Sequence, residues 1–350
     1  MTHPKGYFED FRSSEAVSGI PGFKMNRPLP PTYVTGDVGI EIEVEGRGLP
    51  PCPTTTCKTT GGRWMPHADG SLRGEALEYV FDRPVSIDSV DSLVGGLYSS
   101  FKENKTVLTL SNRCSTHVHL NVSDWRVNHL SSFLALWAAI EPILIDWCGT
   151  ERKTNHFCLG LEDTTATLDA WVDFLKTGVL HFREGLKYTA LNPRHLLDFG
   201  SLEVRIAKGM EDPAPVIAWA KFLWAFRNYV LENFPNPASV PEYVSVRQPT
   251  GIIQDVCAFG NLEGFDRELL EAADEPNLRG FECFRDAQII CYAFPWDTWM
   301  PMITREYVPN PFGSETKRPS EIRTRPLGDD QLRRVATLDR ALLRDIEIRG

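Results

Sequence analysis

Three glutamates alternate with β-branched residues over residues 39–46, which read Gly-Ile-Glu-Ile-Glu-Val-Glu-Gly. Strict alternation between two glycines predicts a strand that carries Glu41, Glu43 and Glu45 on one face. Carboxylates two residues apart on a strand lie roughly 7 Å apart, and at an effective dielectric of about 20 each ionised pair repels by about 2 kcal/mol. On a half-dry surface, a hard divalent cation with oxygen ligands would relieve this repulsion. An edge strand with a solvated acidic face is the alternative reading.

A second group of oxygen-bearing side chains follows a turn signal. Asp69-Gly70-Ser71 favours a turn, and Glu78 lies within a strand pattern over residues 76–81. A single carboxylate among leucine, tyrosine, valine and phenylalanine is unusual on a buried face and ordinary on a solvated one. We therefore treat Asp69, Ser71 and Glu78 as a second candidate group.

Two further alternating segments carry imidazoles and a guanidinium. His117-Val118-His119 places two imidazoles on one strand face, at a separation that suits one metal ion or phosphate group. The same pattern also occurs in zinc hydrolases and in ordinary sheets. Glu203-Val204-Arg205 places an acid beside an arginine, the residue best suited to bidentate phosphate contact. A surface ion pair of little energetic worth is the alternative for that segment.

Taken together, these residues are the parts that magnesium-assisted phosphoryl transfer requires. Carboxylates hold the cation on the phosphates, and a positive side chain stabilises the charge that moves between donor and acceptor. The sequence contains neither Gly-x-x-x-x-Gly-Lys-Ser/Thr nor Gly-x-Gly-x-x-Gly. This excludes a P-loop and a Rossmann nucleotide site.

The elements that must position these residues follow from hydrophobic periodicity. Strands are expected at residues 39–46, 76–81, 106–110, 113–122 and 202–206. Helices are expected at residues 88–104, 124–147 with a kink at Pro142, 165–177 and 213–234. Beyond Pro235 the pattern weakens, and only short helices at 263–273 and 329–346 are expected.

Strands with one apolar and one functional face, alternating with long amphipathic helices, predict an α+β fold. The sheet should be antiparallel or mixed, with helices packed on one face and a concave polar active-site face on the other. We expect an N-terminal arm rich in proline and glycine at residues 1–35, a catalytic core at 36–235 and a C-terminal helical or irregular extension packed on the core at 236–350.

Composition narrows the class of protein further. The net charge of −10 over 350 residues argues against a general binder of nucleic acid or anionic membrane. The longest apolar run, residues 133–140, is far shorter than a bilayer span, and the first 23 residues do not resemble a signal peptide. We therefore expect a cytoplasmic protein whose eight cysteines are reduced. They are Cys52, Cys57, Cys114, Cys148, Cys158, Cys257, Cys283 and Cys291.

The four groups of residues resemble, in chain order, the motifs of the putative amidoligase family. The matching segments are Gly39–Glu43, Asp69–Ser71 with Glu78, Cys114–His119, Tyr188–Asn192 and Leu202–Arg205. That family belongs to the carboxylate-amine ligases of the glutamine synthetase and γ-glutamylcysteine synthetase superfamily. The resemblance covers roughly residues 38–208. Family members usually have glycine where this chain has Ser115, which makes the backbone geometry there a point to examine.

The resemblance implies a glutamine synthetase-like sheet that binds ATP with Mg²⁺ or Mn²⁺ and joins a carboxylate to an amine through an acyl phosphate. The implied metal ligands are Glu41, Glu43, Glu78, His117 and Glu203. Arg205, Glu203 and His119 would be catalytic, with Arg205 steadying the transferred phosphoryl group and His119 touching phosphate or substrate. Ser71, Arg113, Tyr188 and Asn192 would bind cofactor or substrate.

Two other functions stay open at this point. One is a metal-dependent hydrolase that uses His117 and His119 with the carboxylates, and the other is a non-catalytic interaction protein with a vestigial pocket. For the ligase, the substrates would be small-molecule, peptide or protein carboxylates and amines, with no nucleic acid or membrane as partner. A homo-oligomer is compatible with the superfamily.

Overall fold

The computed structural model describes residues 36–51, 64–122, 125, 127–153, 155–161, 163, 167–172, 188–198, 200–273, 287 and 290. The expected N-terminal arm, the helix at 329–346 and four of the cysteines lie outside these residues. Of the helix expected at 165–177, residues 167–172 are described and are helical. The four described cysteines, Cys114, Cys148, Cys158 and Cys257, are buried free thiols, as expected.

A seven-stranded antiparallel sheet forms the centre of the described structure. Its strands are β1 (Val38–Arg47), β2 (Trp64–His67), β3 (Ala76–Phe81), β4 (Val107–Leu108), β5 (Ser115–Asn121), β6 (Leu191–Asn192) and β7 (Ser201–Lys208). The strand order is β2-β3-β1-β5-β7-β6, and the short β4 pairs with the end of β1. The acidic strand β1 is therefore central, between β3 and β5, and not the edge strand of the alternative reading.

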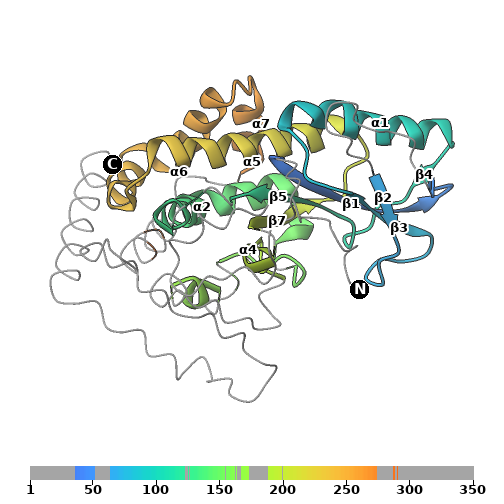
Figure 1. Cartoon of the computed structure of the whole chain (residues 1–350), viewed down its shortest axis with the longest axis horizontal. Coiled ribbons are helices and arrows are strands. Elements are labelled where there is room, and N and C mark those ends of the chain that lie inside the picture. The colour runs from blue at the N-terminus through green and yellow to red at the C-terminus, as the bar shows by residue number, and fades with distance from the viewer. Residues whose placement is uncertain are drawn as a thin grey trace, which may run out of the picture.

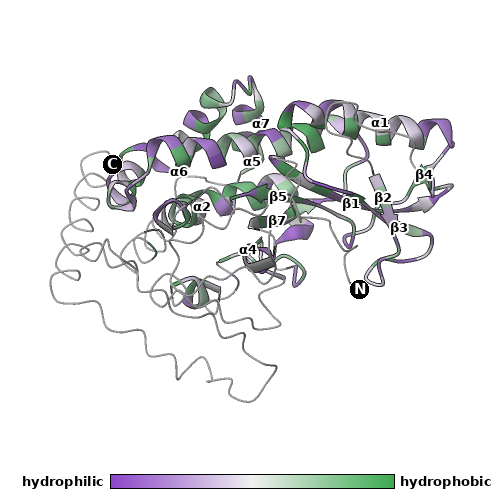
Figure 2. Ribbon diagram, viewed as in Figure 1, coloured by the Kyte–Doolittle hydropathy of each residue, from purple (hydrophilic) through white to green (hydrophobic). Residues whose placement is uncertain are grey.

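The apolar face of β1 is covered by helices. Ile40, Ile42 and Val44 are fully buried, and α5 (Pro213–Asn233) contacts β1 and β5, while α2 (Val127–Cys148) contacts β7. Figure 1 shows α5, α6 (Val240–Phe259) and α1 (Val90–Glu103) running along one side of the sheet. In Figure 2, α1 and α6 carry both hydrophobic and hydrophilic residues around their turns, as helices with one buried side do. The α+β class and the antiparallel sheet are thus confirmed.

The helix α6 is an element that the sequence analysis did not predict, because no helix was expected between Pro235 and residue 262. It packs against α2 and α5, as does the shorter α7 (Phe265–Ala272) against α2. Pro249 lies inside α6, and Gln248 has a φ of 58°, so two helical segments meet there at a kink. Proline in the middle of a helix interrupts its hydrogen bonds, which is why the pattern looked too weak for a helix.

The helix α2 is the most apolar long element of the described residues. Between Asn128 and Cys148 it is long and apolar enough to cross a membrane, by length and composition alone, although 94% of its most apolar window is buried inside the protein. A helix buried on nearly all sides is the usual core helix of a large domain. Pro142 lies inside it, at the position where a kink was expected.

Gly46, at the end of the acidic strand, offers a test of the β1–β4 contact. A Cβ atom built on Gly46 would lie 2.4 Å from the carbonyl oxygen of Val107. We expect Gly46→Ala to lower the free energy of unfolding by about 1–3 kcal/mol, because backbone must move to make room. Urea denaturation would measure this loss.

Gly95, inside α1, is the matched control. A Cβ atom there meets nothing within 4 Å, and alanine is the better helix former, so Gly95→Ala should raise stability by about 0.5–1 kcal/mol. Equal stabilities for the two variants would contradict the close approach of β4 to β1.

Candidate functional site

The register of the sheet places the predicted groups opposite one another. Glu43 of β1 faces Glu78 of β3, Glu41 of β1 faces His117 of β5, and His119 of β5 faces Glu203 of β7. Directly opposed residues of an antiparallel pair extend to the same face. One face of the sheet therefore gathers acids and imidazoles from four strands, and these side chains are buried: the exposed fractions of Glu41, Glu43, His117, His119 and Glu203 are 3%, 5%, 2%, 0% and 1%.

A β-bulge shapes the β5–β7 edge of this cluster. Thr116 faces Ala207 and Val118 faces Val204, so His117 alone stands opposite two residues of β7, Arg205 and Ile206. The backbone groups displaced by the bulge need partners. The side chain of Arg152 supplies them.

Arg152, at the end of the short helix η4 (Thr150–Arg152), is only 2% exposed. Its Nε donates a hydrogen bond to the carbonyl oxygen of Ile206 at 2.9 Å, and its Nη2 donates one to the carbonyl oxygen of Arg205 at 2.8 Å. The sequence analysis did not identify Arg152, because a lone arginine after a helix carries no motif. Its role is to hold the backbone from which the Arg205 side chain extends.

Glu41 joins the two imidazoles of β5. His117 Nδ1 lies 3.1 Å from Glu41 Oε2 and 3.5 Å from Glu203 Oε1, while His119 Nε2 lies 3.2 Å from Glu41 Oε1. The prediction that both imidazoles share one face with the acids is therefore confirmed.

Glu203 is the most heavily bonded carboxylate of the cluster. Arg205 Nη1 donates to its Oε1, and Asn192 Nδ2 donates to its Oε2 at 2.6 Å. His195 Nε2 also lies 3.2 Å from Oε2. His195 begins α4 (His195–Asp198) and was not predicted as a site residue. The only sequence signal was its position three residues after Asn192 and shortly before β7.

Ser115 lies where the resemblance to the amidoligase motifs leads us to expect a glycine, and the structure shows what its side chain contacts. The hydroxyl donates to Glu43 Oε2, and its oxygen lies 2.7 Å from His117 Nε2. The serine therefore links an acid and an imidazole within the cluster. Its backbone belongs to the regular strand β5, where Ser115 pairs with Lys208 of β7.

The remaining predicted residues make contacts of their own. Asp69 Oδ1 accepts a hydrogen bond from the backbone N–H of Ser71 at 2.6 Å, and Arg113 Nη1 donates to the Ser71 carbonyl oxygen at 2.6 Å. Glu45 accepts from the backbone N–H of Arg73, which ties it to the same loop. Tyr188 packs edge-on against Phe157, with ring centroids 5.7 Å apart.

Burial and like charge raise the pKa of the acids on the β1–β3 side. Burial is the main cause that raises the pKa of Glu78 to about 10, and the neighbouring Glu41, Glu43 and Asp69 add to it. Burial also raises the pKa of Glu43, against the opposing effects of His117, Ser115 and Arg205. Among the described residues, the positive groups near these two acids do not offset the effect of burial and of the neighbouring carboxylates.

On the β7 side the balance is reversed. Burial would raise the pKa of Glu203, but Arg205, His195 and His119 together hold it well below its usual range. Glu203, Glu43 and Glu41 in turn raise the pKa of Arg205 despite burial. Among the described residues, the guanidinium of Arg205 is thus paired with Glu203 on the β7 side, and the opposed pair Glu43 and Glu78 keeps an excess of negative charge.

Three groups of side chains in the described residues could hold a metal ion. They are Glu43, Glu78 and His117; Glu41, His117 and Glu203; and His119, His195 and Glu203, and within each group the ligand atoms lie within 4.8 Å of one another. The raised pKa of Glu43 and of Glu78 fits a cation at the first group, since a divalent ion would restore both carboxylates to the charged form.

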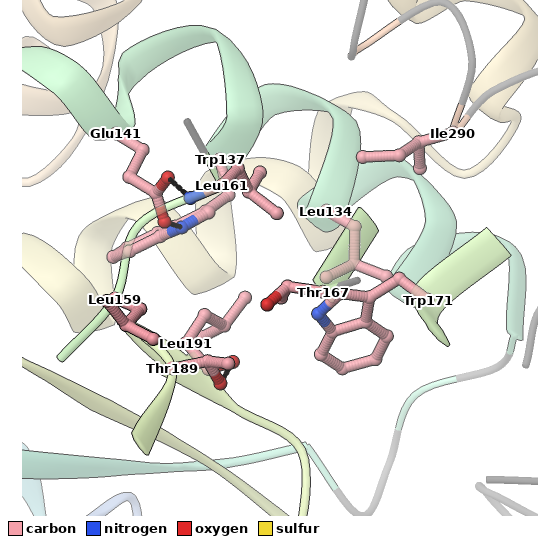
Figure 3. Close-up of a pocket in the computed structure, with 10 residues that line it drawn as sticks. All are labelled: Leu134, Trp137, Glu141, Leu159, Leu161, Thr167, Trp171, Thr189, Leu191 and Ile290. Atoms are coloured by element: carbon pink, nitrogen blue, oxygen red, sulfur yellow. Dashed lines mark hydrogen bonds between the residues drawn. The ribbon is translucent and has the colours of Figure 1, made fainter. Parts of the chain in front are cut away.

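A small, mainly apolar cavity lies beside β6 (Figure 3). It is lined mainly by Trp137 and Leu134 of α2, Trp171 and Leu191. Leu191 and Asn192 are successive strand residues, so this cavity and the polar cluster lie on opposite faces of β6. Glu141, at its border, accepts hydrogen bonds from Trp137 Nε1 and from the backbone N–H of Leu161, which makes it a structural carboxylate.

The raised pKa of Glu78 predicts a specific dependence of stability on pH. The pKa of Glu78 is about 10 in the folded protein, whereas its ordinary value is 4.5. The protonated carboxyl group therefore contributes fully to the free energy of unfolding below pH 4.5, and this contribution is lost as the pH rises toward 10. Glu78→Gln removes this loss. In protein freed of metal, thermal unfolding near neutral pH should therefore give a higher Tm for Glu78→Gln, by about 2–4 °C for each kcal/mol gained.

Glu75→Gln is the control for this measurement, because Glu75 is an exposed carboxylate three residues earlier. It should leave the Tm within a degree or so of the parent at every pH. A Glu78→Gln variant less stable than the parent near neutral pH would show that Glu78 is charged and paired in the folded protein.

Arg152 gives a second prediction, on the bulge. Arg152→Met keeps much of the apolar stem but leaves the carbonyl oxygens of Arg205 and Ile206 without this donor. We expect a loss of about 1–3 kcal/mol in the free energy of unfolding, measured by urea denaturation. Arg267→Met, at an exposed position of α7, should change stability by less than about 0.5 kcal/mol. Equal losses would contradict the role of Arg152.

The family model described as "Putative amidoligase enzyme" matches residues 87–226, which include β5, β6, β7 and both long helices α2 and α5. The strands β1 and β3, with Glu41, Glu43 and Glu78, precede the matched stretch. No curated protein matches the chain. The predicted resemblance to the putative amidoligase family is confirmed over residues 87–226, and the description of that family suggests a ligase-type enzyme.

Proposed function

We propose that this protein is an ATP-dependent carboxylate-amine ligase that forms an amide bond through an acyl phosphate. The observation that carries the proposal is the opposed pair of a buried Glu43 and a half-buried Glu78, which shares one face with His117 and lies within the electrostatic reach of Arg205. A site that combines excess carboxylate with one guanidinium is suited to a metal-nucleotide complex, in which positive metal and negative phosphate are bound together.

Glu43, Glu78 and His117 would hold a Mg²⁺ or Mn²⁺ ion, and Glu41 with Glu203 would offer a second position beside His117. Ions bound at these two positions would neutralise the negative charge of the ATP phosphates. Carboxylate oxygens are the preferred ligands of hard cations, whereas a site for zinc alone would be expected to use more nitrogen or sulfur. The chain's own residues then have to position ATP and the two substrates.

In the first step, an oxygen of the substrate carboxylate attacks the γ-phosphorus of ATP. The bond between that phosphorus and the bridging oxygen breaks, and ADP leaves with the electron pair. Arg205 would steady the transferred phosphoryl group, and Glu203 holds the guanidinium in place through its ion pair. The Arg152 contacts fix the backbone at Arg205 and so restrict where the guanidinium can reach.

In the second step, the amine attacks the acyl carbon, and inorganic phosphate leaves with the carbon–oxygen bond pair. The attacking nitrogen loses a proton, for which His119 is the proposed acceptor, directly or through water. Asn192, Tyr188, Ser71 and Arg113 are the proposed contacts to cofactor or substrate. The substrates would be small-molecule, peptide or protein carboxylates and amines, in the cytoplasm, with no nucleic acid or membrane involved.

The decisive measurement is Mg²⁺-dependent ATP binding and turnover by the full chain. We expect calorimetric binding of a non-hydrolysable ATP analogue only when Mg²⁺ is present, and release of ADP only when a suitable carboxylate and amine from a panel are both added. Glu43→Gln should weaken binding of the Mg²⁺–analogue complex by at least about tenfold, because it removes a charged ligand.

Glu263→Gln is the matched control, since Glu263 is exposed between α6 and α7, and it should bind as the parent does. If Glu43→Gln binds the Mg²⁺ complex as tightly as the parent, the cation assignment is wrong. Substrate hydrolysis with bound zinc or manganese and no need for ATP would favour the hydrolase alternative instead.

A further inference from the structure

The imidazole of His195 plays no part in the proposed ligase chemistry, yet it lies in the polar cluster. Its Nε2 is 3.2 Å from Glu203 Oε2, and its ring is 5.1 Å from the ring of His119 at an angle of 61°. Ligand atoms of His119, His195 and Glu203 all lie within 4.8 Å of one another. The three side chains come from β5, α4 and β7, so the fold brings together residues that are far apart in the chain.

We propose that His119, His195 and Glu203 form a further binding site for a transition-metal ion, such as Zn²⁺, Co²⁺ or Mn²⁺, which shares His119 and Glu203 with the proposed catalytic groups and adds His195 to them. Two imidazoles and one carboxylate are typical ligands of such ions, whereas Mg²⁺ prefers oxygen. The site differs in this respect from the carboxylate pair Glu43 and Glu78, and it goes beyond the proposed function because it does not require ATP.

The two oxygens of Glu203 are already divided between different neighbours. Oε1 bonds Arg205 and lies near His117, while Oε2 accepts a hydrogen bond from Asn192 and lies near His195. A carboxylate oxygen has two lone pairs. Asn192 uses one of those on Oε2, and a metal ion can take the place of the proton between Oε2 and His195 Nε2 without disturbing Arg205.

The position of His195 is fixed by local structure. Asn192 Oδ1 accepts a hydrogen bond from the backbone N–H of Arg194 at 2.9 Å, and the backbone N–H of Leu196 donates to the Pro193 carbonyl oxygen at 3.0 Å. His195 is 9% exposed, and His119 and Glu203 are more deeply buried. A preformed site of this kind loses little conformational entropy when an ion binds.

An ion at this site would cross-link α4 to strands β5 and β7. Asn192 lies beside it, bonded both to Glu203 and to the turn that carries His195. We therefore infer a structural role, in which the ion orders the turn at residues 192–195 next to the reacting groups.

Cobalt titration of the full chain tests this site directly. After dialysis against a chelator, we expect the parent protein to bind Co²⁺ with visible absorption bands typical of imidazole ligation, and to keep them in excess Mg²⁺. His195→Gln should weaken Co²⁺ binding by at least about tenfold. His195→Cys should retain binding and add a thiolate-to-cobalt band in the near ultraviolet, which only a direct ligand would produce.

His156→Gln is the matched control, because His156 is an exposed histidine outside the cluster, and it should bind Co²⁺ as the parent does. Equal Tm values in chelator would show that the His195 variants are folded. Unchanged Co²⁺ affinity and spectrum in His195→Gln, or no Co²⁺ binding by the parent, would overturn the proposal. Mg²⁺-dependent binding of the ATP analogue by His195→Gln, measured in parallel, separates this outcome from failure of the ligase proposal.

Discussion

The rest of the site depends on one constraint, which is that two carboxylates face each other on neighbouring strands: Glu43 on β1, which is buried, and Glu78 on β3, which is half-buried. Like charges directly opposed in a sheet destabilise it, and burial increases the cost because water cannot screen them. The described residues place one guanidinium in the cluster, and it is bonded to Glu203 on the far side. The repulsion between these two carboxylates is therefore relieved either when they are protonated or when they bind a cation together.

At β7, the same sheet surrounds a carboxylate with hydrogen-bond donors and positive charge. Arg205, Asn192 and His195 all reach Glu203. The donors come from three separate elements, β6, α4 and β7, so the network ties these elements together. Across a single face, the sheet therefore passes from excess negative charge at β3 to balanced charge at β7, and the proposed function uses this difference to bind the metal and phosphate parts of one ligand.

Much of this arrangement could be predicted from the sequence, because strand alternation determines which side chains share a face. Alternation at Glu41 and Glu43, His117 and His119, and Glu203 and Arg205 was sufficient to group the cluster. It could not reveal Arg152 or His195, whose roles depend on tertiary contacts of short elements with no period to detect. The helix α6 was missed for another reason, since its internal proline breaks the local signal while its packing on α2 restores the helix.

The bulge in β7 changes which side chains at the end of this strand lie on the acidic face. Side chains of a regular strand alternate between its two faces. Counting by two from Val204, which lies on the helix-covered face, would therefore assign Lys208 to that same face. The extra residue reverses that parity, so Lys208 pairs with Ser115, whose hydroxyl reaches Glu43. A basic residue therefore lies at the rim of the acidic face. An alignment that assumes unbroken alternation through Arg205 and Ile206 would assign the residues at the end of this strand to the wrong faces of the sheet.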